Sequence, residues 1–247
     1  MKKHLIVSLA AIMAAGTAHA DGFFINPRIA WTQTHVDESR TEKAVQNGTW
    51  SSFVGNKHES WSGLARKFAP RVAVGYDYAT PKYGIFGAEV EYGQTSNHFD
   101  PTRGYVDFAG DAINDSDSRD FKYSESTLSL NARYGYDLKY IIPFLSAGVG
   151  YTTIDSENNF RSGTYWWETR DSEHNMSWNI GLGIEMPVTH NIAMTIAYRY
   201  TDLGRVKYTN RMYHENATLN KNGIERNFDS NVDITKHEIM AGVKMSF

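Results

Sequence analysis

Eight segments of this chain alternate large apolar side chains with small or polar ones, and this pattern limits the fold more than any other feature. Successive side chains of a β-strand point to opposite faces, so alternation with a period of two indicates strands. Each segment has about the 9 to 11 residues that a tilted strand needs to cross a bilayer. The segments are residues 23–31, 68–78, 86–93, 128–136, 145–152, 176–185, 192–200 and 238–247.

The composition of the two faces indicates which one meets lipid. In segment 68–78, for example, Val72 and Tyr76 alternate with Arg71 and Gly75. The polar set carries charges, glycines, serines and asparagines, which suits the narrow lumen of a small transmembrane barrel. A soluble barrel would turn this set outward and pack the apolar set inside. The sequence therefore predicts an all-β fold, a transmembrane antiparallel up-and-down β-barrel of eight strands with its apolar side chains toward lipid.

The connections between the segments alternate between short and long. Residues 79–82, 137–140 and 187–190 form tight turns, whereas the connections at about 36–65, 95–122, 155–174 and 207–233 are long and polar. Outer-membrane barrels have short periplasmic turns and long extracellular loops. We therefore expect both termini in the periplasm and all four long connections outside the cell.

Aromatic residues gather near both ends of the apolar faces. Aromatic rings prefer the headgroup level of a bilayer, so two girdles are expected. The outer girdle would hold Trp31, Tyr92, Tyr151, Trp178 and Tyr200, and the inner girdle Phe23, Tyr76, Phe86, Tyr136 and Phe247.

The first twenty residues have the features of a secretory signal peptide. Lys2 and Lys3 precede an apolar stretch over 5–15, and Ala18-His19-Ala20 has the small-x-small pattern of a cleavage site. An uncleaved membrane helix is the alternative, but the stretch is shorter than the roughly 20 residues that such a helix needs. We expect cleavage before Asp21, which leaves residues 21–247 as a single barrel domain exported to the outer membrane of a Gram-negative cell.

Composition excludes several other classes of protein. The chain has no cysteine, so it forms no disulfide framework, thiol nucleophile or thiolate metal site. Its 25 Lys and Arg residues stand against 28 Asp and Glu residues, a balance that does not suggest a nucleic-acid partner. Beyond the first twenty residues, no stretch approaches the apolar length of a membrane helix.

The end of the chain resembles a known assembly signal. Residues 239–247 finish in Phe247, with Val243 and Met245 at the alternate positions before it. With the sequence Tyr198-Arg199-Tyr200-Thr201-Asp202-Leu203-Gly204 and the strand count, the mature chain resembles the opacity-type porins and the wider OmpA-like barrel superfamily. The resemblance implies a monomer surrounded by lipopolysaccharide and phospholipid, recognition of the C-terminus by the barrel assembly machinery, a narrow pore in some members, and loops that bind host-cell receptors in the opacity proteins.

Charged residues of the polar set concentrate on the first four segments. Arg28, Arg71 and Arg133 would face Glu89 and Glu91 at similar heights in the lumen. Buried charges are costly unless they are paired, so we expect a salt-bridged plug. A gate or an ion-selective constriction is the alternative, because the same charges would tune a pore if the lumen held water.

Enzymatic activity and metal binding are both less favoured. A lipid A-modifying hydrolase would need a Ser nucleophile near a His, and the outward neighbours of His237 on the preceding segment are Ile196, Tyr198 and Tyr200. We therefore expect no enzyme and no cofactor. A calcium site is conceivable among the second-loop acids, but they lack the spacing of a dedicated calcium loop, and no metal is expected. These acids are Asp107, Asp111, Asp115, Asp117 and Asp120.

Large aromatic residues in the long connections are candidate binding anchors. Aromatic side chains dominate interface hot spots, although these rings could equally pack the loops on one another. The candidates are Trp50, Trp61, Tyr165, Trp166 and Trp167. Two functions remain in play: an adhesin-like surface interaction and structural protein, and a narrow porin for ions or small solutes.

Overall fold

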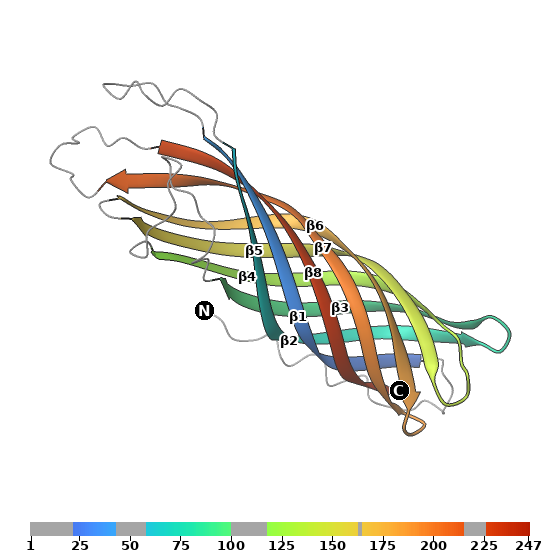
Figure 1. Ribbon diagram of the computed structural model, residues 1–247. Helices are drawn as coiled ribbons and strands as arrows, with labels where there is room; N and C mark the ends of the chain where they lie inside the picture. Colours follow the sequence, from blue (N-terminus) through green and yellow to red (C-terminus); the bar gives the residue numbers. More distant parts are fainter. Residues whose placement is uncertain (1–21, 43–57, 100–117, 163–164, 215–225) are drawn as a thin grey trace, which may run out of the picture.

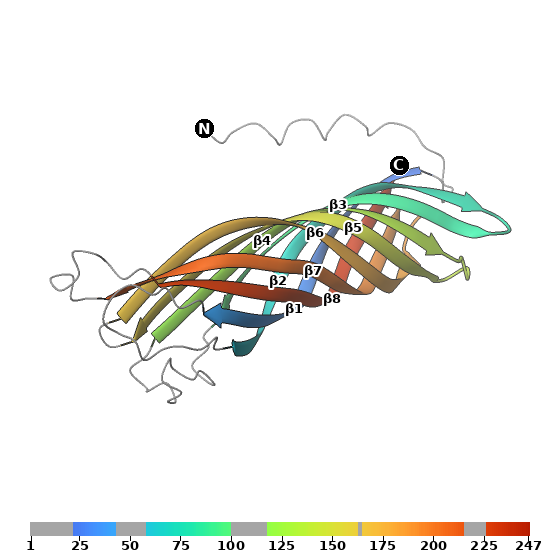
Figure 2. The ribbon, with the colours of Figure 1, turned by 90° about the horizontal axis from the view of Figure 1, so that it is seen from above.

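The computed structural model describes residues 22–42, 58–99, 118–162, 165–214 and 226–247. They form eight strands that close into one barrel in sequence order, each antiparallel to its neighbours, with β1 also paired to β8 (Figures 1 and 2). Each of the eight segments predicted from the alternation falls in one strand, with segments 128–136 and 238–247 running one residue past the end of their strands, so the predicted fold is confirmed. The strands are β1 (Gly22–Glu42), β2 (His58–Thr80), β3 (Gly84–Phe99), β4 (Ser118–Gly135), β5 (Ile142–Ser162), β6 (Tyr165–Pro187), β7 (Ile192–His214) and β8 (Arg226–Ser246).

Short turns and both chain ends of the barrel lie at one end. The turns follow β2, β4 and β6, as the sequence predicts. At the β4–β5 turn, Leu138 N–H donates to the Ile141 carbonyl over 3.0 Å. The two ends of the barrel sequence meet there, because Phe247 N–H donates to the Phe23 carbonyl over 2.9 Å. By the rule for outer-membrane barrels, this is the periplasmic end.

The bilayer-facing surface carries the large apolar set of every strand. Ile29, Leu130, Val149 and Ile180, for example, are all exposed on the outside of the barrel. Aromatic rings pair across strands near both ends of this surface. Trp178 and Tyr200 have ring centroids 5.5 Å apart in the outer girdle, and Phe23 and Tyr76 lie 5.1 Å apart in the inner one. Among the described residues, no helix is long and apolar enough to cross a bilayer.

The strands are longer than the sequence reading predicted. They hold 16 to 23 residues instead of about 10, so much of each expected long connection is strand. Trp61 therefore lies in β2, and Tyr165, Trp166 and Trp167 begin β6. The alternation continues past the outer girdle with its polarity reversed: Val36 and Ile154 point into the barrel, while Asp37 and Asp155 are exposed on the outside. A search for apolar outward faces misses these upper segments.

A bulge in β7 keeps that reversed pattern in register. Gly204 has a φ of +76°, and its N–H donates to Oδ1 of Asp202 over 2.8 Å. The pairing of β7 with β8 shifts by one residue between Asp202 and Arg205. Bulges of this kind use a glycine in the left-handed region. As a result, Leu203 and Val206 both point inward although they are three residues apart.

Pairing between β2 and β3 stops partway up the barrel. Within the described part of the chain, these strands pair only from Arg71–Gly93 down to Thr80–Gly84, and the segment of β2 before Arg71 pairs with β1 alone. Pro70 stands where the pairing ends, and proline has no N–H to donate to a neighbour. In Figure 1, β1 and β2 rise steeply away from β3 above this point.

Candidate functional site in the charged lumen

The lumen is filled with paired charges. Among the described residues, six cationic and six anionic side chains point into the barrel, and none of them is more than 8% exposed. They form two groups. The central cluster contains Arg28, Arg71, Arg199, Lys236, Glu89, Glu91, Glu125 and Glu238, and the periplasmic cluster contains Asp77, Arg133, Glu185 and Lys244.

Glu91 is the hub of the central cluster. Its carboxylate accepts from Arg28 Nη1 over 2.6 Å, from Arg71 Nη1 over 3.2 Å and from Arg199 Nη2 over 3.1 Å. Arg28 also donates to the Glu89 carboxylate from both Nη1 and Nη2, over 2.9 and 2.6 Å. Such forked guanidinium–carboxylate bonds are strong and fix geometry as well as charge.

The central cluster continues across β8 toward the extracellular end. Arg71 Nη2 donates to Glu238, and Lys236 Nζ donates to Glu125. The hydroxyl of Tyr123 donates to the other oxygen of Glu125. Cations and anions are equal in number here, so the cluster is neutral when every group is ionised.

The periplasmic cluster combines ion pairs with aromatic rings. Glu185 accepts from Arg133 Nη2 over 2.7 Å and from Lys244 Nζ over 2.9 Å, and Lys244 also donates to Asp77. The Arg133 guanidinium lies 4.6 Å from the centroid of Phe144, a cation–π contact in a place without bulk water. This cluster is also neutral.

The five residues expected to form one plug are all in the lumen, but they do not form a single group. Arg28, Arg71, Glu89 and Glu91 share the central cluster. Arg133 pairs with Gly87 across β3 and β4, one step nearer the periplasm than Glu89, and its ion pairs go to Glu185 and Asp77.

Seven further members of the two clusters were not picked out from the sequence. Most come from the second half of the chain, including Glu185, Arg199, Lys236, Glu238 and Lys244. Their signal was present, because each stands on the inward side of its strand. Their partners on the first four strands are far away in sequence, and only closure of the barrel brings the two groups into contact.

Beside the charges, an arc of small hydroxyl and amide groups lines β4, β5 and β6. The Thr152 hydroxyl lies 3.0 Å from the Thr127 hydroxyl and donates to Oγ of Ser177 over 3.1 Å. Nδ2 of Asn179 donates to Oδ1 of Asn131 over 2.9 Å. Gly148 makes room for this arc, because a Cβ there would stand 1.9 Å from Oδ1 of Asn131. The side chains therefore fill the lumen at this level.

Above the central cluster the lumen becomes apolar. A buried apolar layer joins residues from β1, β2, β4, β5, β7 and β8, and on β1 it lies five residues beyond Trp31 of the outer girdle. Its members are Val36, Ala65, Tyr123, Ile154, Leu203, Val206, Val232 and Ile234. Below it, a void of about 10 Å³ beside Arg28, Glu89 and Arg133 has room for about one water molecule. The lumen is thus closed by charge pairs and again by apolar packing.

Outside the barrel, beyond the outer girdle, the surface is polar. Arg205 binds both carboxylate oxygens of Asp233, over 2.8 and 3.0 Å, and this exposed pair raises the pKa of Arg205. His237 lies at the height of the girdle, where its Nδ1 is 2.6 Å from the Tyr198 hydroxyl. The partner of this imidazole is therefore a phenol instead of the serine that a hydrolase would need.

Several candidate residues lie where the structure gives no side-chain detail. Trp50, Asp107, Asp111, Asp115 and Asp117 are outside the described residues, as is the expected signal peptide. The side chains of Trp61, Asp120, Tyr165, Trp166 and Trp167 are outside them too. Within the described part of the chain, no group of three or more His, Cys, Asp or Glu side chains is placed to hold a metal ion. In the assembly signal, Val243 is exposed to the bilayer.

Comparison with known proteins agrees with this architecture. Residues 5–247 match the family described as the outer membrane protein beta-barrel domain, so the chain belongs to that family and its place is the Gram-negative outer membrane. The 25 kDa outer-membrane immunogenic protein of Brucella abortus is 35% identical over 80 residues, which are 32% of this chain and 34% of the Brucella protein. This chain thus matches only about a third of that relative's length.

Two further likenesses extend over more of the chain. The outer membrane protein PagN of Salmonella typhimurium is 25% identical over 186 residues, 73% of each protein. The crystal structure of the outer membrane protease OmpT from Escherichia coli has a TM-score of 0.51, covering 92% of this chain and 97% of that chain at 9% identity. At that identity the likeness to OmpT shows the barrel fold alone.

Proposed function

We propose that this outer-membrane protein is an adhesin-like surface interaction and structural protein that acts through its extracellular end. The observation that carries the proposal is the filled lumen, because among the described residues paired charges and the apolar layer occupy the interior of the barrel. An eight-stranded barrel is just wide enough for side chains to fill it. Binding then has to use the outer surface.

The shape of the molecule supports this proposal. The strands continue well beyond the outer girdle, so the strand ends that flank residues 43–57, 100–117 and 215–225 lie away from the membrane. Binding residues often lie on loops held by a scaffold such as these strand ends. The name of the Brucella relatives describes them as immunogenic, which fits exposure of this end of the fold.

A narrow pore is the second candidate, and one observation favours it. Buried polar atoms such as Nε of Arg71 and Nε of Arg199 have no hydrogen-bond partner among the residues that the structure describes. Water in the lumen would satisfy them, and a hydrated lumen can conduct if its ion pairs rearrange. Continuous conduction would still require both the central cluster and the apolar layer to open.

Export and membrane assembly are the next steps that we propose. The signal over 1–20 would be removed before Asp21, and the monomeric barrel would be inserted by the assembly machinery through Val243, Met245 and Phe247. Deleting Phe247 should lower the amount of folded, heat-modifiable protein in the outer membrane. An unchanged yield would contradict this role of the C-terminus.

The adhesive function is tested by replacing three of the four extracellular connections, residues 43–57, 100–117 and 215–225, with short Gly-Ser turns. Bacteria that express this variant should insert it normally but lose attachment to cultured epithelial monolayers. Replacing the periplasmic turn 187–191 is the control, and it should leave attachment unchanged. Equal attachment by all three strains would refute the proposal.

A further inference from the structure

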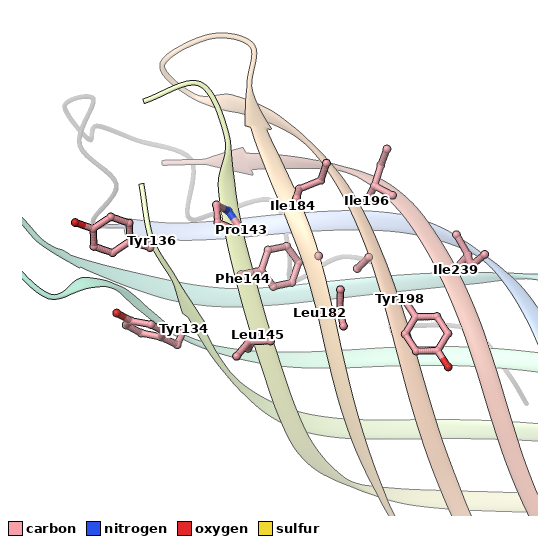
Figure 3. A pocket seen from close by; sticks show the side chains of 12 residues that line it. Tyr134, Tyr136, Pro143, Phe144, Leu145, Leu182, Ile184, Ile196, Tyr198 and Ile239 are labelled. Carbon is pink, nitrogen blue, oxygen red and sulfur yellow. The ribbon is translucent and has the colours of Figure 1, made fainter. Parts of the chain in front are cut away.

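An apolar groove of about 670 Å³ lies on the bilayer-facing surface of β4 to β8 (Figure 3). Its sides are two rows of outward side chains that run across the strands. One row contains Tyr134, Leu145, Leu182 and Tyr198, and the other contains Pro143, Ile184 and Ile196. The groove lies between the aromatic girdles and extends to Tyr136, beside the periplasmic turn between β4 and β5.

The floor of the groove is the barrel wall between these two rows, at residues whose side chains belong to the inward set. Gly183 and Ala197 lie side by side on β6 and β7. A Cβ on Gly183 would come within 2.6 Å of both the Ile196 carbonyl oxygen and the Phe144 ring, so only glycine fits there. On the lumen side, the Phe144 ring packs against Gly183, and the Arg133 guanidinium lies 4.6 Å from the centroid of that ring. The periplasmic cluster thus contacts the inner face of the wall behind the groove.

The surroundings of the groove determine what can occupy it. It faces hydrocarbon, so the occupant is apolar over its length. On a convex barrel face, an acyl chain contacts protein along one side, whereas in this open groove it lies between two rows of side chains and makes more van der Waals contacts. The periplasmic leaflet supplies such chains in the form of phospholipids, whose phosphates lie at the level of the periplasmic turns.

The turn at the periplasmic mouth of the groove carries a cation. Lys139 has a φ of +80°, and its Nζ lies 5.4 Å from the centroid of the exposed Tyr140 ring. In the described part of the chain, Lys139 has no carboxylate partner for its ammonium group; Asp137 accepts only its backbone N–H, over 2.6 Å. A lysine ammonium is a compact point charge that suits a phosphate.

We propose that the groove is a binding site for one diacyl phospholipid of the periplasmic leaflet. An acyl chain lies along Tyr134, Leu182 and Ile196, and the phosphate binds Lys139 at the mouth. Apolar enclosure and a cation at the correct end are separate features, and only their combination distinguishes this site from ordinary contact with the surrounding lipid. The proposal does not depend on what the extracellular end binds.

Native mass spectrometry of the full-length, delipidated barrel tests the site with phosphatidylglycerol and with diacylglycerol of the same chains. Ile196→Trp fills the groove, and Val74→Trp places the same ring on the bilayer-facing surface of β2 as its control. The unmodified protein should bind one phosphatidylglycerol about tenfold more tightly than any further copy. Ile196→Trp should abolish that preference, and Val74→Trp should keep it. Leu145→Trp serves in place of Ile196→Trp if the latter does not fold.

The headgroup contact has its own matched pair. Lys82 stands 5.3 Å from the Tyr83 ring on the β2–β3 turn, so it repeats the Lys139 arrangement away from the groove. Lys139→Gln should weaken phosphatidylglycerol several-fold without affecting diacylglycerol, whereas Lys82→Gln should change neither. The proposal is overturned if phosphatidylglycerol binding falls equally in Ile196→Trp and Val74→Trp, or equally in Lys139→Gln and Lys82→Gln. It is also overturned if many lipids bind in a graded series with no first tight one.

Discussion

The membrane-spanning half of the barrel and its extracellular half are built with opposite polarity. Between the girdles, large apolar side chains face outward and charges face the lumen, as with Leu130 outside and Glu91 inside. Beyond the outer girdle, Val36 and Leu203 are buried in the lumen while Arg205 and Asp233 pair outside. One continuous sheet therefore contacts lipid over its lower half and water over its upper half, and the position along each strand decides which face is apolar.

This comparison explains how the two halves are stabilised. The lower half gains little from transferring its apolar face out of water into its own interior, because that face meets lipid; its lumen depends on paired charges. The upper half stands in water and has an apolar interior like that of a soluble barrel. Each half can be disrupted separately by a change that the other half would tolerate.

The largest expected effect comes from breaking the hub of the central cluster. Glu91→Ala leaves Arg28, Arg71 and Arg199 without their shared carboxylate, and removing one partner of a buried pair costs about 3 to 5 kcal/mol. Urea unfolding of the refolded barrel, followed by its gel mobility, measures this loss. Asp233→Ala, which breaks an exposed pair above the membrane, is the control and should leave the midpoint unchanged. Similar midpoints for both variants would show that the charged lumen is not a stabilising element.

A smaller effect is expected from truncating the apolar layer. Leu203→Ala opens a cavity in a fully buried site and should lower the free energy of unfolding by about 3 kcal/mol. Leu182→Ala removes the same atoms from the lipid-facing surface, where acyl chains can refill the space. Urea unfolding in lipid vesicles should show a clearly smaller loss for Leu182→Ala. The reverse order would break the comparison between the two halves.

The smallest effect concerns the bulge that keeps the upper half in register. Gly204→Ala places a Cβ on a residue with a φ of +76°, which costs about 1 kcal/mol. The loss should appear in the same unfolding measurement. Ser126→Ala, a change at a partly exposed position on β4, is the control and should have little effect. A stable Gly204→Ala variant would mean that the bulge does not depend on this glycine.

The sequence predicts the lower half of this molecule well and the upper half poorly. Segments such as 128–136 and 192–200 stand out because lipid requires a continuous apolar face. Beyond Trp31 and Tyr200 the requirement ends, and the apolar set becomes smaller and moves to the other face. The bulge at Gly204 then changes the phase of the alternation on β7, which hides the inward position of Val206 from any search with a fixed period of two.

The lumen shows a second limit of sequence reasoning. Inward orientation can be predicted from parity, and Arg28, Arg71 and Glu91 were found in that way. The partner of each charge cannot be predicted in this way. The contact between Arg71 and Glu238 joins residues 167 positions apart in the chain and exists only after β1 and β8 close the sheet. The stagger of the strands also sets the height of each side chain, which is why Arg133 pairs with Glu185 and not with Glu89.

Single-channel recording in planar bilayers tests the central claim that the lumen is closed. The purified barrel should show only small, flickering conductance, because the central cluster and the apolar layer both obstruct the lumen. Changing Glu89 and Glu91 together to Gln removes the partners of Arg28 and Arg199, so it should increase the frequency or size of these openings. A large, steady conductance of the unmodified protein, with no further rise in the double variant, would show that the lumen is open and that the protein is a pore.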